Sequence, residues 1–235
     1  MPRTRLVLAM LAAGAVMFTG CSSNDGEPPA DNSAPRQQNE ARVANENDSR
    51  ERELTPDQLK AAIGRVILSE GDIGHDTEVQ NQDDSLDVPT NDVCGKQGRS
   101  DGDRLARNQD FFWKGARNPD LVVSNEAVAY KPGKGEAALE EIKKAVEDCD
   151  GWKHDEGQIK DIEVVDAPKG ALEGSFAWRG TDDRKEADYS YIAVYQRNGD
   201  LLSAIYVWST DKDQLDEVAE DLTVKAAQRL ERALN

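Results

Sequence analysis

The sequence has little of what many catalytic and metal sites are built from. Its 235 residues include two histidines and three cysteines. His75 and His154 lie far apart, each among acidic residues, which is typical of solvated loop histidines and not of zinc ligands at a regular spacing. No Cys-x-x-Cys pair, Gly-x-Ser-x-Gly turn or Walker loop occurs. We therefore expect a protein without metal or cofactor that is not an enzyme.

Positive charge and long apolar runs are also scarce. The chain has 29 Lys and Arg against 46 Asp and Glu, a net charge of −17 at pH 7. Phosphate backbones require a basic surface, so this balance argues against nucleic acid as a partner. The longest apolar run, 6–18, has 13 residues. That is too short for a helix to cross a hydrocarbon core of about 30 Å.

The N-terminal segment has the pattern of an export signal. Two arginines precede the apolar run, which ends in Thr19-Gly20-Cys21, so we expect residues 1–20 to be a signal peptide. The small residues before Cys21 resemble the lipobox of bacterial lipoproteins, although Phe18 stands where that motif has Leu, Val or Ile. The resemblance implies a Cys21 acylated with palmitate-type lipid, on the outer face of the cell membrane. The alternative is a secreted protein with a free Cys21.

Composition divides the remainder into a tether and one domain. Residues 21–53 follow the lipid site with prolines and polar side chains, and Val43 is their only large aliphatic residue. Such a segment buries too little apolar surface to offset its ordering entropy, so we expect a disordered tether. Residues 54–235 have the length and apolar periodicity of a single folded domain.

The clearest structural signal in the domain is a hairpin over 188–209. Two runs rich in tyrosine and β-branched residues meet at Asn198-Gly199, which favours a type I′ turn. That turn would place Tyr191 opposite Tyr206. The period-2 rule then gives one aliphatic face and one aromatic face.

The other periodic segments indicate an α+β fold. A doubly wound sheet needs regular alternation of strands and helices. The hairpin contradicts that alternation, because two strands follow each other directly. We predict a twisted antiparallel sheet with helices packed mainly on one face. The expected helices begin at the Thr55-Pro56 cap, at Gly135 and at Ser209 or Thr210, and the expected strands lie near 78–81, 108–116, 121–130, 159–165 and 173–179.

The aromatic face of the hairpin is the candidate binding site. Large rings around the small Ala193 and Ala204 would form a groove with polar edges. Helices usually cover aliphatic faces, so we expect the aromatic face to be partly open; the alternative is that it is core. The expected ligand-binding residues are Tyr189, Tyr191, Tyr195, Tyr206, Trp208 and Trp178.

Two cysteines remain once Cys21 is assigned to the lipid. Cys94 and Cys149 lie in a domain that we expect to be exported, where a disulfide is the obvious pairing. A reactive thiol is the alternative, but neither cysteine has the local signature of a nucleophile.

One family resemblance is carried by specific segments. The run AVAYKPGKGEAALEEIKKAVEDCDGW, then YIAVYQRNGDLLSAIYVWS and a long C-terminal helix, resembles the extracellular sensor domain of PknH-type actinobacterial Ser/Thr kinases. The resemblance covers most of 54–235 and is strongest at Tyr130, Cys149, Trp152 and the Asn198-Gly199 turn. It implies a helix-backed antiparallel sheet with a cleft, a structural disulfide and an unidentified ligand. Relatives of that domain also occur as free lipoproteins.

These observations predict a monomeric, lipid-anchored binding or sensor protein on the extracytoplasmic face of the cell membrane. Its partner would be an unknown small molecule or an envelope protein. Kinase signalling is not implied, because the sequence has one available cysteine pair where kinase members can have two and shows no kinase domain. The alternatives are an envelope-acting hydrolase that uses Asp182, Asp183 or Asp188, and an assembly lipoprotein that docks through its acidic face.

Overall fold

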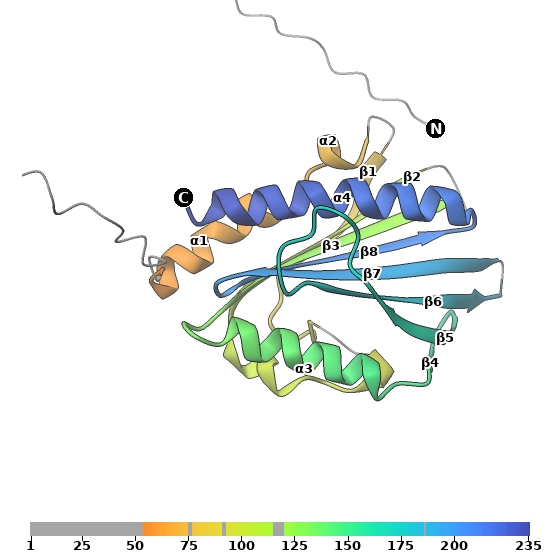
Figure 1. Ribbon diagram of the computed structural model, residues 1–235, viewed down its shortest axis with the longest axis horizontal. Coiled ribbons are helices and arrows are strands. Elements are labelled where there is room, and N and C mark those ends of the chain that lie inside the picture. Colours follow the sequence, from red (N-terminus) through yellow and green to blue (C-terminus); the bar gives the residue numbers. More distant parts are fainter. Residues whose placement is uncertain (1–53, 75–76, 91–92, 115–119, 186) are drawn as a thin grey trace, which may run out of the picture. The chain divides into compact units, whose positions relative to one another are not determined.

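The computed structural model describes residues 54–74, 77–90, 93–114, 120–185 and 187–235 (Figure 1). The expected signal peptide, the tether and His75 lie outside these residues. Within the described part, no helix is both long and apolar enough to span a membrane. The strands are β1 Thr77–Asp83, β2 Arg104–Lys114, β3 Leu121–Tyr130, β4 Trp152–His154, β5 Gly157–Val165, β6 Phe176–Arg184, β7 Asp188–Asn198 and β8 Leu201–Ser209.

These eight strands form one antiparallel sheet in the order β1-β2-β3-β8-β7-β6-β5-β4. The predicted α+β class is therefore confirmed. The central hairpin lies in the middle of the sheet. The described helices are α1 Pro56–Val66, α2 Glu70–Ile73, α3 Gly135–Glu147 and α4 Lys212–Ala233, with short 3₁₀ turns η1 Val93–Gly95 and η2 Arg99–Asp103.

The two sheet faces have different side chains and different cover. Helices α1, α2 and α4 lie on one side of the sheet, and α3 lies on the other (Figure 1). Beneath α4, Ile192, Val194, Ile205 and Val207 pack against the apolar stripe of the helix. The alternate residues of the hairpin, with their tyrosines, belong to the cluster that includes α3. The predicted division into aliphatic and aromatic faces is confirmed.

Charged side chains explain why several elements differ from their predicted bounds. β2 begins at Arg104, earlier than expected, and β6 runs on to Arg184 through acidic residues. Buried charges such as Arg107 and Asp182 are accommodated there by ion pairs, most of them with partners on other segments of the chain. Local β propensity does not report such pairs. Helix α4 is capped by Asp211, one residue beyond the predicted caps, because Ser209 still belongs to β8.

The central turn also differs from its prediction. Asn198 pairs with Leu201 and Tyr191 pairs with Trp208, so the two-residue loop is Gly199-Asp200. Of these two, Gly199 alone has a positive φ, 58°, as in a type II′ turn. The expected type I′ turn and the Tyr191–Tyr206 pairing are wrong. The pairing is displaced by two residues on β8, and an even displacement leaves every side chain on its predicted face.

The position of this turn is explained by the start of α3. The Asp200 carboxylate accepts hydrogen bonds from the backbone N–H groups of Gly133, Lys134 and Gly135, each at 2.9 Å. A Cβ on Gly135 would lie 2.6 Å from the Gly199 carbonyl oxygen, so only glycine permits this approach. A carboxylate at a helix N-terminus also complements the helix dipole. The turn and α3 therefore fix each other.

Replacing Asp200 should test this link. Asp200→Ala leaves three backbone donors at the start of α3 without their acceptor, and we expect the free energy of unfolding to fall by about 1–2 kcal/mol. Asp200→Asn keeps an acceptor oxygen but loses the charge, so its loss should be smaller. Urea unfolding of the three proteins measures both effects. An alanine variant as stable as the wild type would contradict this account.

Candidate functional site

A cavity of about 310 Å³ lies on the aromatic side of the sheet. Its floor comes from β2, β6, β7 and β8, and further wall residues come from β4, β5, residues 88–90 and Val93. The volume lies at the lower end of the range for small-molecule sites. Aromatic rings dominate the lining: Phe111, Trp152, Trp178, Tyr191, Tyr195, Tyr206 and Trp208.

Five of the six predicted site residues line this cavity, and Tyr189 does not. The Tyr189 ring lies instead beneath the Arg184 guanidinium, 5.4 Å from ring centroid to Cζ. The expected partly open face is corrected, because these rings are largely covered. Tyr195 is 0% exposed and Trp178 is 1% exposed. Helix α3 and the chain near η1 cover this face, and the cavity is the space that remains between them and the sheet.

The rings support one another around the cavity. Ring centroids are 5.9 Å apart for Trp152 and Trp178, 4.7 Å for Trp178 and Tyr191, and 4.9 Å for Tyr191 and Trp208. Tyr206 continues the series, 6.2 Å from Trp208. These spacings lie in the favourable range for aromatic pairs. The walls are therefore held by packing, as in a largely preformed binding site.

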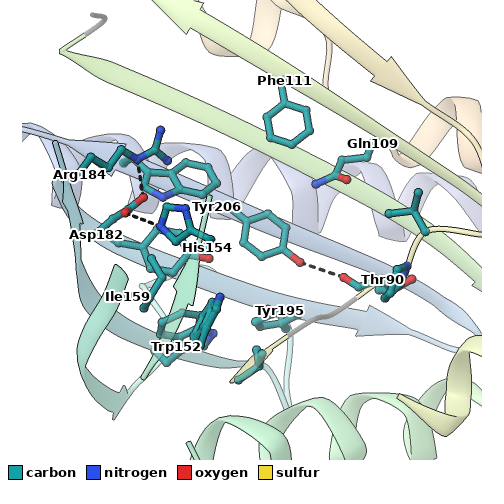
Figure 2. A pocket seen from close by; sticks show the side chains of 16 residues that line it. Thr90, Gln109, Phe111, Trp152, His154, Ile159, Asp182, Arg184, Tyr195 and Tyr206 are labelled. Atoms are coloured by element: carbon teal, nitrogen blue, oxygen red, sulfur yellow. Dashed lines mark hydrogen bonds and ion pairs between the residues drawn. The ribbon is translucent and has the colours of Figure 1, made fainter. Parts of the chain in front are cut away.

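One end of the cavity is polar (Figure 2). Asp182 is 1% exposed; its Oδ1 lies 2.9 Å from His154 Nε2 and its Oδ2 accepts from Arg184 Nε at 2.7 Å. Arg184 also donates to Glu156 at 2.8 Å. The prediction of a solvated loop for His154 is wrong, because it lies in β4 beside this buried carboxylate. β4 has three residues, too few to show strand alternation in the sequence.

Two ring donors at the cavity have no acceptor. Among the described residues, Trp178 Nε1 and Trp208 Nε1 are buried and make no hydrogen bond. Both indoles line the cavity. A buried donor without an acceptor costs free energy, about 1–3 kcal/mol. An occupant with acceptor atoms would therefore be stabilised here more than a pure hydrocarbon.

A buried arginine holds one wall of the cavity in place. Arg104 donates to the carbonyl oxygens of Leu86 and Val88 at 2.7 Å each, and to Thr90 Oγ1 at 3.0 Å. Thr90 N in turn donates to Asp101 at 3.2 Å. The segment 86–90 has no regular secondary structure, so these bonds replace the backbone pairing of a strand.

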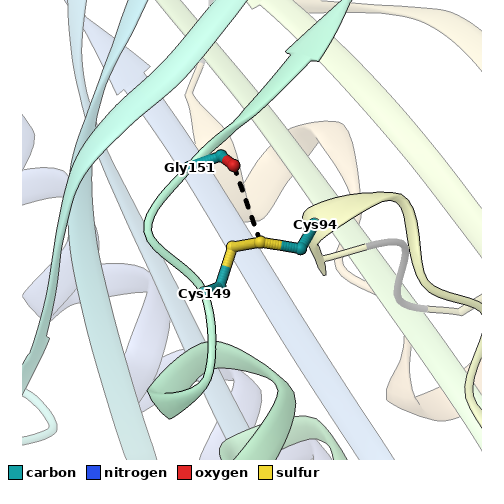
Figure 3. The surroundings of a disulfide bond; sticks show 3 residues. All are labelled: Cys94, Cys149 and Gly151. Carbon is teal, nitrogen blue, oxygen red and sulfur yellow. Dashed lines mark hydrogen bonds between the residues drawn. A yellow bond between two sulfur atoms is a disulfide. The ribbon is translucent and has the colours of Figure 1, made fainter.

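A second wall contact is covalent. The predicted disulfide joins Cys94 in η1 to Cys149 just after α3, with a separation of 55 residues (Figure 3). Cys94 Sγ also lies 3.6 Å from the Gly151 carbonyl oxygen. In the chain-entropy model, closing a loop of this length stabilises the fold by about 4 kcal/mol. Because Val93 lines the cavity, the disulfide also fixes that wall to the segment that leads into Trp152.

A buried acid lies next to the cavity floor. The Tyr206 hydroxyl is 3.5 Å from Glu126 Oε2 and 3.5 Å from the Thr90 carbonyl oxygen. Burial raises the pKa of Glu126 from 4.5 to about 7, although Arg107, which donates to its other oxygen, favours the charged form. The pKa of Tyr206 is raised well above its ordinary value, mainly by burial, so its hydroxyl stays protonated and can donate.

The other acids proposed for hydrolysis do not meet at the cavity. Asp182 lines it, but both of its oxygens are engaged by His154 and Arg184. Asp183, its neighbour on β6, is exposed and pairs with Lys160 at 2.9 Å. Asp188 is exposed and is not part of the lining. Asp183 and Asp188 face each other across β6 and β7, but outside the cavity lining, so the three acids do not place a carboxylate pair at the cavity.

Comparisons with known proteins identify the fold. No protein-family model and no curated protein matches the sequence. The structure is similar to the crystal structure of the extracellular domain of PknH from Mycobacterium tuberculosis, with a TM-score of 0.54 and 10% sequence identity. The match covers 72% of this chain and 96% of that chain. The chain thus shares the fold that the sequence resemblance implied.

The raised pKa of Glu126 predicts a pH-dependent stability. Between about pH 5 and 7 the folded chain holds a proton on Glu126 that the unfolded chain has released, so this contribution to stability falls as pH rises and levels off above about 7. A tenfold difference in proton affinity between the folded and unfolded chains corresponds to about 1.4 kcal/mol of stability.

The variant Glu126→Gln removes the titrating group and serves as the reference for this pH effect. We expect the difference in unfolding free energy, wild type minus variant, to decrease from pH 5 to 8 in urea titrations. A constant or increasing difference would contradict the prediction.

Proposed function

We propose that this chain is an extracytoplasmic, non-enzymatic binding domain of the sensor type, which holds a small ligand in the aromatic cavity. The observation that carries the proposal is the cavity itself, where packed rings meet a polar end and two buried indole donors have no acceptor. Few convergent polar groups in a mostly apolar pocket are typical of ligand sites. The shared fold with an extracellular domain supports this setting.

The alternatives have less support from the geometry. A hydrolase would have to rely on His154 and Asp182, because Asp183 and Asp188 lie away from the cavity. Arg184 holds the second oxygen of Asp182, which suits a fixed recognition group more than a carboxylate with a free oxygen. An assembly role would use the outer acidic surface and would not involve the cavity.

We propose that the domain acts as a monomer.

The proposed attachment to the membrane is through lipid on Cys21. A signal-like segment, a small-residue motif before Cys21 and a polar segment after it support this attachment. The disulfide between the other two cysteines supports an oxidising compartment. The segment 22–53 would then serve as the spacer between lipid and domain.

The ligand proposal is tested with purified protein and an envelope extract. After incubation, native mass spectrometry should detect a bound small molecule on the wild type. Trp208→Ala and Arg184→Gln remove lining groups and should lower its retention at least several-fold. Arg179→Gln is the matched control, because Arg179 lies on the same strand but pairs with Asp216 of α4. No bound molecule on any protein, or equal retention on all four, would reject the cavity as the site.

The lipid proposal is tested by Cys21→Ala. Without the acceptor thiol, the protein should move from the membrane fraction to the soluble fraction, because one lipid anchor provides its membrane affinity. The unfolding midpoint of the domain should not change, since Cys21 is far from the domain in sequence. Unchanged association with the membrane would contradict the anchor.

A further inference from the structure

The aromatic floor continues beyond the cavity onto an exposed part of the sheet. Trp113 of β2 is 43% exposed. Side chains alternate along a strand, and Phe111 lines the cavity while Phe112 packs with the cluster beneath α4. Trp113 therefore points to the cavity side. It pairs with Val122, which pairs with Trp208, so one cross-strand row leads from the cavity to Trp113.

All four tryptophans of the chain belong to this surface. Trp178 is buried, Trp152 and Trp208 are partly exposed, and Trp113 is the most open. We call these four residues, with Tyr191, the aromatic strip. From β6 to β2 the strip crosses four strand spacings, or roughly 19 Å at about 4.8 Å each. A ligand that uses its whole length is elongated, with one end enclosed and the other open.

The polar groups along the strip restrict the chemistry of such a ligand. A hydrocarbon chain has no atom that could accept a hydrogen bond from the indole N–H groups of Trp178 and Trp208. The charged group of an organic cation has no such acceptor either. An anion meets a chain of net charge −17, and Arg184, the one arginine or lysine among the described lining residues, is already paired with Asp182 and Glu156. A neutral ligand with oxygen acceptors and flat apolar faces remains.

Sugar rings combine these two properties. The C–H groups on the face of a pyranose pack on aromatic rings, while hydroxyl and ring oxygens at its edge accept and donate hydrogen bonds. At the polar end, His154, Asp182 and Arg184 already hydrogen-bond one another, and a carboxylate oxygen that accepts one such bond can accept a second from a sugar hydroxyl. A linear chain of such rings also matches a row of aromatic side chains that starts in a cavity and ends in solvent.

We infer that the aromatic strip binds a neutral linear oligosaccharide. The terminal sugar occupies the cavity between Trp152 and Tyr191, and the following units lie over Trp208 and Trp113. This inference rests on the proposed function, because it names the ligand class of the same cavity. It adds a binding element outside the cavity, Trp113, that a small compact ligand would not reach.

The test uses neutral oligosaccharides of defined length. A panel of glucose, mannose and N-acetylglucosamine oligomers, from monomer to hexamer, is titrated into the wild-type protein. Tryptophan fluorescence reports binding directly, because every tryptophan lies on the strip, and calorimetry gives Kd. At least one series should bind, with affinity that increases with length until Trp113 is covered. Myristate serves as the hydrocarbon probe and should bind at least tenfold more weakly.

Variants at Trp113 separate stacking from general hydrophobic contact. Trp113→Ala should weaken the longest bound oligomer by about tenfold, the loss expected for one aromatic stacking contact, and should change the affinity of the monomer less than twofold. Trp113→Phe keeps a ring and should restore most of the affinity. Trp113→Leu keeps apolar area without a ring and should resemble the alanine variant. Trp113 is exposed, so these variants should fold as the wild type does.

Three outcomes would overturn the inference. If myristate binds and no sugar does, or if an envelope compound occupies the cavity and no oligomer displaces it, the ligand class is wrong while the proposed function stands. If sugars bind equally at every length, or if Trp113→Ala has no effect on long oligomers, the strip outside the cavity is wrong. If neither the panel, myristate nor the extract provides a ligand, both the inference and the proposed function fail.

Discussion

The alternation of side chains along β7 and β8 is the constraint on which the structure depends. These strands occupy the centre of the sheet, so each of their residues faces one of two layers. Ile192, Val194 and Ile205 support α4, while Tyr191 and Tyr195 form part of the cavity. A shift of one residue would exchange the two sets and place polar-edged rings under α4. Both the helical layer and the candidate site therefore follow from one binary pattern.

This pattern explains why much of the fold could be predicted from the sequence. Long periodic segments specify α3, α4 and the hairpin through local signals, and five of the six predicted rings line the cavity. The turn differs from its prediction because its position depends on Asp200, whose partners lie 65 to 67 residues earlier in the chain. The His154–Asp182 contact joins residues 28 positions apart across β5. Pairwise contacts of this kind leave no periodic trace in the sequence.

The openness expected of the aromatic face is wrong for a related reason. The sequence shows that the rings share a face, but it does not show what packs over that face. Cover comes from α3 and from residues 86–90, which are held by the buried Arg104 through carbonyl oxygens. Arginine in a strand sequence normally indicates solvent exposure. Here its planar guanidinium organises a wall that has no secondary structure, so the cavity wall is held by hydrogen bonds of the protein itself.

The disulfide has a consequence for when the cavity is complete. It joins Cys94, next to the wall residue Val93, to the segment between α3 and Trp152. Thiols stay reduced in the cytosol and are oxidised after export. For the exported binding protein that we propose, a newly made chain would carry an untethered cavity wall until its thiols are oxidised, and the proposed ligand binding would be confined to the oxidised protein. The bond that stabilises the domain would thus also make the proposed binding depend on the redox state of the compartment.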